Sequence, residues 1–306
     1  MCLYLIQEMG GITVDKIRKP SVAGQFYDTR EENLKQTIEE CFLGNRGPKS
    51  LPKIDEGDKK IRGLVVPHAG YIYSGAIAAH SYKLLANNGF ANTFIIIGPN
   101  HTGVGSDVAV MTEGSWLTPL GKVPINQELS KHLLKGIIDK DENAHMYEHS
   151  IEVQLPFLQF SAGNKKFDFV PICMTIQDFE TANQVGRIIA DSIKKIDENI
   201  VIIASTDFSH AGFNYMSVPP EGMRVDRYAE EQDKFAIDQI IDMDPKGLVD
   251  TVQNKRITMC GYGPVAAMLT ASKILGASKA ELLKYGTSYE VQPSSSCVGY
   301  GALAIY

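Results

Sequence analysis

The sequence has few cysteines, and their number and spacing argue against a fold held together by disulfides. The 306 residues contain five cysteines, an odd number, and none of them forms a C-x-x-C pair. Disulfide frameworks usually contain an even number of cysteines. We therefore expect the protein to work in a reducing compartment. The cysteines are Cys2, Cys41, Cys173, Cys260 and Cys297.

Long hydrophobic runs are missing as well. The longest apolar runs, such as 93–99 (TFIIIGP) and 199–206 (NIVIIAST), are as long as strands, whereas a membrane-spanning helix needs about 20 apolar residues. The opening MCLYLIQEMGG is apolar for six residues, lacks a basic segment and contains Glu8, so it does not match a secretory signal. We expect a cytoplasmic protein that does not associate with a membrane.

The chain also lacks an excess of basic residues. It has 30 Lys and Arg against 36 Asp and Glu, which gives a formal net charge of −6, and the pI is about 5.7. Proteins that bind nucleic acid usually carry a basic patch that follows the phosphate backbone. We therefore expect no nucleic-acid partner.

Apolar runs alternate with amphipathic stretches along most of the chain, and this alternation predicts an α/β fold. The expected strands are apolar on both faces, which is typical of a sheet covered by helices on both sides. The fold class is therefore α/β: a single domain with a mixed, largely parallel β-sheet covered by helices on both faces. The expected strands are 63–67, 93–99, 168–174, 199–205, 281–289 and 298–306, and the expected helices are 75–86, 181–196, 230–242 and 263–276.

One pair of segments departs from the alternation of strands and helices. Residues 107–114 and 120–126 show a period of two and are joined by a short segment with Trp116 and Pro119. We expect a hairpin that extends the sheet and makes it mixed. The polar stretch 44–60, rich in Gly, Pro and Lys, predicts a surface loop.

Three of the expected strands lead directly into ionisable side chains. The strand at 63–67 is followed by His68, the strand at 93–99 by His101, and the strand at 199–205 by Asp207 and His210. In an open α/β sheet, ligands bind at the carboxyl ends of the strands. We therefore expect these side chains to share one crevice, although a single histidine after a strand is more often a loop residue.

Two further residues are candidates for the same crevice. His149 precedes an amphipathic segment and either faces the crevice or begins the helix. Cys260 precedes Gly261, Gly263 and Pro264, which indicate the start of a helix. A helix N-terminus lowers the pKa of a thiol, so we expect a thiolate that can bind a metal or act as a nucleophile.

Seven segments of the sequence resemble the Memo family, also called the AmmeMemoRadiSam system protein B family. They occur in the order of the family: RKPSVAGQFY, PHAGYIYSG, IIIGPNHTG, YEHSIEVQLPFL, ASTDFSHAG, MCGYGPV and VGYGALAIY. The resemblance implies one Memo-like domain over 17–306, with 1–16 as an N-terminal extension. It also implies a fold similar to that of class III extradiol dioxygenases, which are non-haem iron enzymes.

The resemblance implies a specific set of site residues. Metal would be bound by His68, His101 and Cys260, with iron expected first and copper or zinc as alternatives. His210 would serve as acid or base, and Asp207 would orient or charge it. The thiolate in place of the carboxylate ligand of the dioxygenases puts dioxygenase activity in doubt. We expect no nucleotide cofactor.

The resemblance also bears on ligands and partners. His149 and Tyr71 are expected in the pocket, which would take a small molecule or a peptide. Phe26 stands where many relatives have a tryptophan that is proposed to bind phosphotyrosine peptides, so peptide binding is expected to be weaker. A radical-SAM protein of the same pathway is an expected partner.

Three functions remain open from the sequence. The first is a metal-dependent oxidoreductase of unknown substrate. The second is a binding, adaptor or metal-handling protein without catalytic activity. The third is a hydrolase that uses Cys260 as nucleophile and His210 as base, without a metal.

Overall fold

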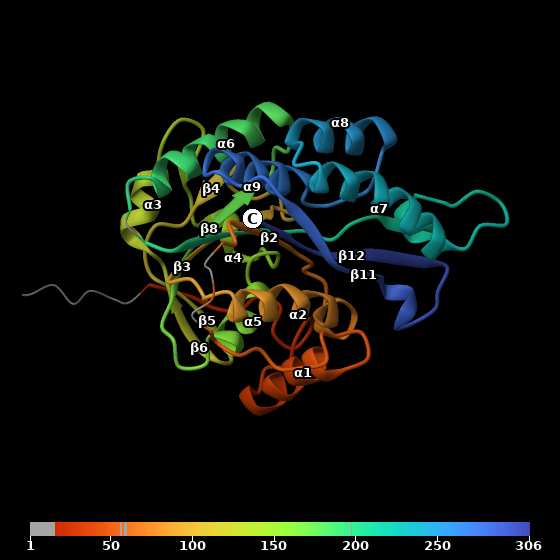
Figure 1. Ribbon diagram of the computed structural model, residues 1–306, viewed down its shortest axis with the longest axis horizontal. Helices are drawn as coiled ribbons and strands as arrows, with labels where there is room; N and C mark the ends of the chain where they lie inside the picture. Colours follow the sequence, from red (N-terminus) through yellow and green to blue (C-terminus); the bar gives the residue numbers. More distant parts are fainter. Residues whose placement is uncertain (1–15, 56, 58–59, 197) are drawn as a thin grey trace, which may run out of the picture.

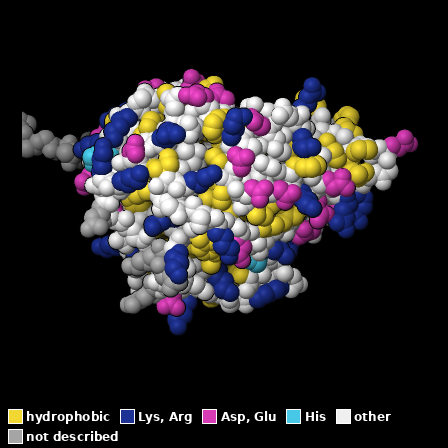
Figure 2. Space-filling view, turned by 45° about the horizontal axis from the view of Figure 1, so that its top comes forward, with side chains coloured by type: hydrophobic (Ala, Val, Ile, Leu, Met, Phe, Trp, Pro, Cys, Tyr) yellow, Lys and Arg dark blue, Asp and Glu magenta, His cyan; other side chains and the backbone are white. Residues whose placement is uncertain are grey.

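The structure is a computed structural model and describes residues 16–55, 57, 60–196 and 198–306 (Figure 1). The expected N-terminal extension lies outside these residues, apart from Lys16. On the face shown in Figure 2, basic and acidic side chains are interspersed over most of the surface.

A mixed sheet forms the centre of the molecule. Its four central strands run parallel to one another, and antiparallel strands flank them on both sides. Within the described residues this sheet has nine strands. In spatial order they are β10 (His210–Gly212), β12 (Ser296–Ile305), β2 (Gly63–Val66), β9 (Ile200–Ser205), β3 (Thr93–Pro99), β8 (Asp168–Met174), β4 (Val108–Val110) and β7 (Asp139–Lys140), with β11 (Ala280–Thr287) paired to β12.

Helices cover both faces of this sheet (Figure 1). Strand β3 shows why, because Ile95 and Ile97 pack into the core on one face while Phe94 and Ile96 pack into the core on the other. One face is covered by α3 (Gln127–Leu133), α6 (Phe179–Ile193), α7 (Val225–Ile241), α8 (Pro245–Lys255) and α9 (Tyr262–Ile274), and the other by α1 (Glu31–Leu43), α2 (Tyr71–Asn87), α4 (Asn143–Met146) and α5 (Gln154–Ala162). Short 3₁₀ helices are η1 (Phe213–Tyr215) and η2 (Ser288–Glu290). The predicted mixed α/β fold is confirmed.

The predicted hairpin is wrong in its first arm and in the sheet to which it belongs. The hairpin is formed by β5 (Ser115–Thr118) and β6 (Gly121–Pro124), and it builds a separate three-stranded sheet with β1 (Ile17–Arg18). Trp116 lies within β5 rather than in the turn, because its ring is buried against the Arg18 guanidinium and Phe169. The preceding residues form β4, which pairs with β8 and β7 in the main sheet.

The register of the central strands brings their carboxyl ends to one edge. Val66 at the end of β2 pairs with Ser205 at the end of β9, and Ala204 of β9 pairs with Ile97 of β3. The residues that follow these three strands therefore emerge side by side. None of the described helices is long and apolar enough to cross a membrane.

Candidate metal centre

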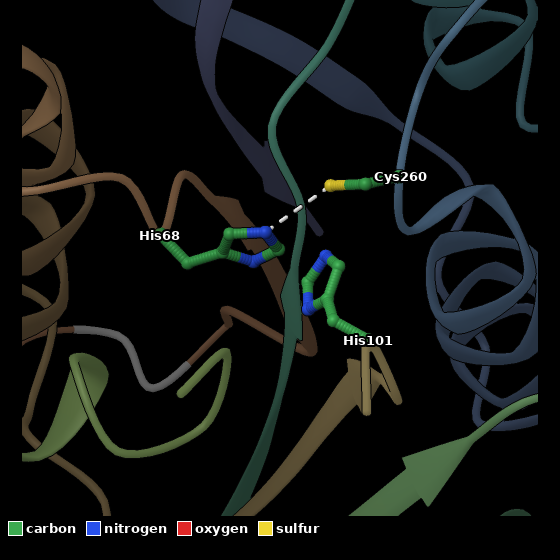
Figure 3. Close-up of side chains that lie close together, drawn as sticks. All are labelled: His68, His101 and Cys260. Atoms are coloured by element: carbon green, nitrogen blue, oxygen red, sulfur yellow. Dashed lines mark hydrogen bonds between the residues drawn. The ribbon is translucent and has the colours of Figure 1, made fainter. Parts of the chain in front are cut away.

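Three side chains from distant parts of the chain converge at this edge of the sheet. His68 follows β2, His101 follows β3, and Cys260 lies two residues before α9. One ligand atom from each residue lies within 4.8 Å of the others. Figure 3 shows the sulfur of Cys260 directed at His68, with the ring of His101 pointing toward the same space. The structure thus places together the three residues that the resemblance implies as metal ligands.

His68 is the most deeply buried member of this group. Its ring Nε2 lies 3.1 Å from Cys260 Sγ, and its Nδ1 lies 3.0 Å from Ser205 Oγ. Burial, followed by the nearby His149, His101 and other imidazoles, holds the pKa of His68 well below its usual range. The ring is therefore neutral near pH 7, which is the form in which histidine binds a metal.

His101 is oriented by a buried carboxylate. Its Nδ1 lies 3.0 Å from Glu148 Oε1, and Glu148 is completely buried. Burial acts to raise the pKa of this carboxyl. The hydrogen bond from His101, the charges of His101 and His149 and the N–H of Ser150 outweigh burial, and they hold the pKa at about 2. Glu148 is thus ionised and accepts the Nδ1 proton, which leaves Nε2 of His101 as a donor to a metal. Carboxylates hold metal-binding histidines in this way in many proteins.

The thiol of Cys260 does not have the lowered pKa that the sequence predicts. Burial and the Asp207 carboxylate raise the pKa of Cys260 instead. The start of α9 does not offset this, because the N–H of Gly263 donates to Gln177 Oε1 and not to the sulfur. The N–H that the sulfur accepts, at 3.2 Å, belongs to Asp207, which lies outside α9. A bound cation would reverse the balance, because coordination to a metal deprotonates a thiol.

His210 lies at the same edge, and its own tautomer can be read from its contacts. Its Nδ1 is 3.1 Å from the carbonyl oxygens of both Phe208 and Thr258. Carbonyl oxygens only accept hydrogen bonds, so Nδ1 carries the proton and Nε2 is left to accept another. Asp207 lies close enough to His210 to interact with its charge, while its Oδ1 accepts the backbone N–H of His68 at 2.8 Å, so its role toward His210 stays a prediction.

A cavity of about 580 Å³ opens over these histidines. His68, His101, Asp207 and His210 line it, and so does His149. The ring of His149 stacks on that of His101, with 4.7 Å between centroids. The cavity therefore gives a small molecule access to the face of the candidate centre.

Two aromatic residues near the cavity differ in their position. Phe26 lines it and packs against His149 at 4.9 Å between ring centroids. Tyr71 is not part of the lining, contrary to prediction, because it is buried in the core and its hydroxyl donates to the carbonyl of Val153 at 2.6 Å. Its position in the first turn of α2 directs it toward α5 rather than toward the cavity.

A second group, His101, Glu148 and His149, also has the spacing of a metal site. Its carboxylate is already occupied. Glu148 Oε1 accepts the backbone N–H groups of His149 and Ser150 at 2.8 Å each, and Oε2 accepts that of His101. These bonds place Glu148 behind His101 as its support, so the first group is the better candidate.

The sequence did not identify the residues that hold the metal-site loop in place. This loop comprises residues 147–152 (YEHSIE) and carries Glu148 and His149. Arg18 is buried and donates to Glu152, to the carbonyl of Glu148 at 2.7 Å and to that of His145 at 3.1 Å. Ser21 also donates to Glu152, through its N–H at 2.8 Å. The motif RKPS therefore holds the metal-site loop through one buried polar network. A single sequence does not reveal this pairing.

The chain is similar to several known proteins. A family model described as Memo-like protein matches residues 18–304. A MEMO1 family protein of Methanopyrus kandleri is 46% identical over 289 residues, which cover 94% of this chain and 98% of that protein. One of Methanocaldococcus jannaschii is 46% identical over 300 residues, which cover 95% of this chain and 100% of that protein. The solved structure of an uncharacterized protein from Escherichia coli K12 has a TM-score of 0.49 and 14% identity, covering 79% of this chain and 99% of that chain.

Proposed function

This chain belongs to the Memo-like protein family, as its motifs predict, and on that premise we propose that it is a metal-dependent oxidoreductase. The metal would be held by Nε2 of His68, Nε2 of His101 and Sγ of Cys260. The observation that carries the proposal is that one ligand atom from each of the three residues lies within 4.8 Å of the others.

The donor set fits a transition metal. Two neutral imidazoles and one thiolate suit iron, copper or zinc, and three protein ligands leave a position open for chemistry. We propose iron first, because the motifs resemble those of a family related to non-haem iron enzymes. When bound, the ion would supply redox chemistry at this open position.

The surrounding residues have distinct roles in the proposal. His210 donates from Nδ1 to two backbone carbonyls and lines the cavity, so its Nε2 is the atom that would exchange a proton with a bound molecule. Asp207 holds the backbone of His68 through its N–H. The thiol of Cys260 contacts His68 rather than His210, so no contact favours the hydrolase in which His210 activates Cys260.

The experiment is purification under anaerobic conditions, followed by elemental analysis and EPR. We expect close to one metal ion per chain in the wild type and a large loss in Cys260→Ser. Cys41→Ser is a matched control, because Cys41 is a buried cysteine in the helical layer, and it should retain the metal. Equal metal content in wild type and Cys260→Ser would refute the ligand assignment.

The role of His210 needs a separate variant. His210→Gln should retain the metal, because His210 is an acid or base in the proposal and not a ligand. Loss of metal in His210→Gln equal to that in Cys260→Ser would show that its role is assigned wrongly.

A further inference from the structure

A chain of buried hydrogen bonds leads from His68 into the core. Ser205 Oγ, 3.0 Å from His68 Nδ1, also lies 2.6 Å from the carbonyl oxygen of Ser150 and 2.7 Å from Gln154 Nε2. Ser205, Ser150 and Gln154 are all buried. Each hydrogen in this chain can be assigned from its neighbours, because several of the partners can only donate or only accept.

The amide of Gln154 is fixed from two sides. Its Nε2 lies 3.0 Å from the carbonyl oxygen of Pro67, and its Oε1 accepts the hydroxyl of Tyr82 at 2.5 Å. A flipped amide would place Oε1 against the Pro67 carbonyl, with two acceptors facing each other. The NH₂ group therefore points at Ser205 and donates to its hydroxyl oxygen.

The hydroxyl of Ser205 then has no hydrogen left for His68. Its one hydrogen goes to the carbonyl of Ser150, which can only accept, and one of its two lone pairs receives the Gln154 amide. The second lone pair faces His68 Nδ1, so this nitrogen must carry a hydrogen.

We infer that Ser205 and Gln154 are positioning residues that lock His68 in the tautomer with a hydrogen on Nδ1 and a lone pair on Nε2. This lone pair points at Cys260 Sγ, which lies 3.1 Å away. The metal of the proposed function would bind to both of these atoms. The tautomer is a property of the metal-free protein, and only its consequence for metal affinity rests on the proposed function.

The same network also reaches the second histidine. The backbone of Ser150 accepts from Ser205 through its carbonyl oxygen and donates from its N–H to Glu148 Oε1, at 2.8 Å. Glu148 in turn accepts Nδ1 of His101. One residue, Ser150, thus connects the supports of both imidazoles, and both rings present Nε2 to the same space.

The direct test is nitrogen-15 NMR of the metal-free wild type with labelled histidine. Long-range proton–nitrogen correlations show which ring nitrogen carries the hydrogen, and the signals of His68 are assigned by their loss in His68→Gln. We expect His68 as the Nδ1–H tautomer. A His68 ring that is protonated on Nε2, or a mixture of the two tautomers, would overturn the inference.

The second test measures zinc affinity by competition with a chromophoric chelator. Ser205→Ala should bind Zn²⁺ about 10- to 100-fold more weakly than wild type, the usual effect of losing a group that orients a metal ligand. Ser192→Ala is the matched control, because Ser192 is also buried and its hydroxyl bonds to a backbone carbonyl, that of His132 at 3.0 Å. It should stay within about twofold of wild type.

The two tests separate the inference from the proposed function. Zinc binding by Ser205→Ala as tight as that of wild type would overturn the positioning role. Zinc binding that is unchanged in His68→Gln would refute the metal site itself, while the tautomer measured in the metal-free wild type would still decide the inference. If Ser205→Ala does not fold, the NMR measurement on the wild type alone is decisive.

Discussion

Replacing Asp233 with asparagine should change how the stability of the protein depends on pH. Asp233 lies on α7 and is completely buried. Its carboxylate accepts the backbone N–H of Ser209, next to His210, at 2.7 Å and the hydroxyl of Tyr285 at 2.7 Å. Burial outweighs these hydrogen bonds and raises the pKa of Asp233 to about 6 from an ordinary value of 3.8.

The direction of the pH effect follows from this shift. Because the pKa is raised in the folded state, the folded protein binds the proton more tightly than the unfolded chain does. The contribution of Asp233 to stability is therefore largest below about pH 4, falls as the pH rises toward 6, and stays low above it. A shift of this size corresponds to about 3 kcal/mol over the whole range, of which about 2 kcal/mol falls between pH 4.5 and pH 7.

The measurement is urea unfolding of wild type and Asp233→Asn at pH values from 4.5 to 7. Asparagine does not titrate, so the stability of Asp233→Asn relative to wild type should rise by about 2 kcal/mol over this range. Asp238→Asn makes the same chemical change at an exposed position of α7 and controls for the loss of one charge. A stability difference between Asp233→Asn and wild type that stays constant with pH would refute the reasoning.

Two further substitutions test the network beneath the metal-site loop. Arg18→Met should lower the free energy of unfolding by about 3 to 5 kcal/mol, because it leaves the buried Glu152 carboxylate without its cation. Urea unfolding measures this change. A loss below about 1 kcal/mol would show that the pair behaves like a surface pair. Glu148→Gln should weaken zinc binding about 10- to 100-fold, because His101 loses its hydrogen bond to an ionised carboxylate. Competition with a chelator measures the affinity, and an unchanged affinity would contradict the role of Glu148.

Much of the site could be predicted from the order of apolar runs. The runs ending near His68, His101 and Asp207 became β2, β3 and β9, which are neighbours in the sheet. Because these strands are parallel, their carboxyl ends meet at one edge, and the residues that follow them meet as well. Cys260 was found from the glycines and the proline that begin α9.

The parts that could not be predicted depend on contacts between distant segments. The environment of the Cys260 thiol depends on the N–H of Asp207 and on Gln177, which caps the start of α9. The support of His68 comes from Ser205 and Gln154, whose residue types are common in any strand or helix. Neither their burial nor their partners can be read from a single sequence.

The misplaced hairpin has a physical cause of the same kind. Alternation between polar and apolar residues marks 107–114, whereas the strand that contains Trp116 reads Ser-Trp-Leu-Thr and does not alternate. The segment with Trp116, and not 107–114, pairs with 121–124, and the Arg18 guanidinium lies 4.3 Å from the centre of the Trp116 ring. That contact joins segments almost a hundred residues apart, so local pattern could not reveal it.

The most direct test of the metal centre is a crystal structure of the metal-loaded protein with anomalous scattering recorded at the absorption edge of the metal. We predict one strong peak at about 2.0–2.1 Å from Nε2 of His68 and of His101 and about 2.3 Å from Sγ of Cys260, as for zinc bound to these donors. An anomalous peak beside other side chains, with no peak near these three residues, would contradict the proposed function.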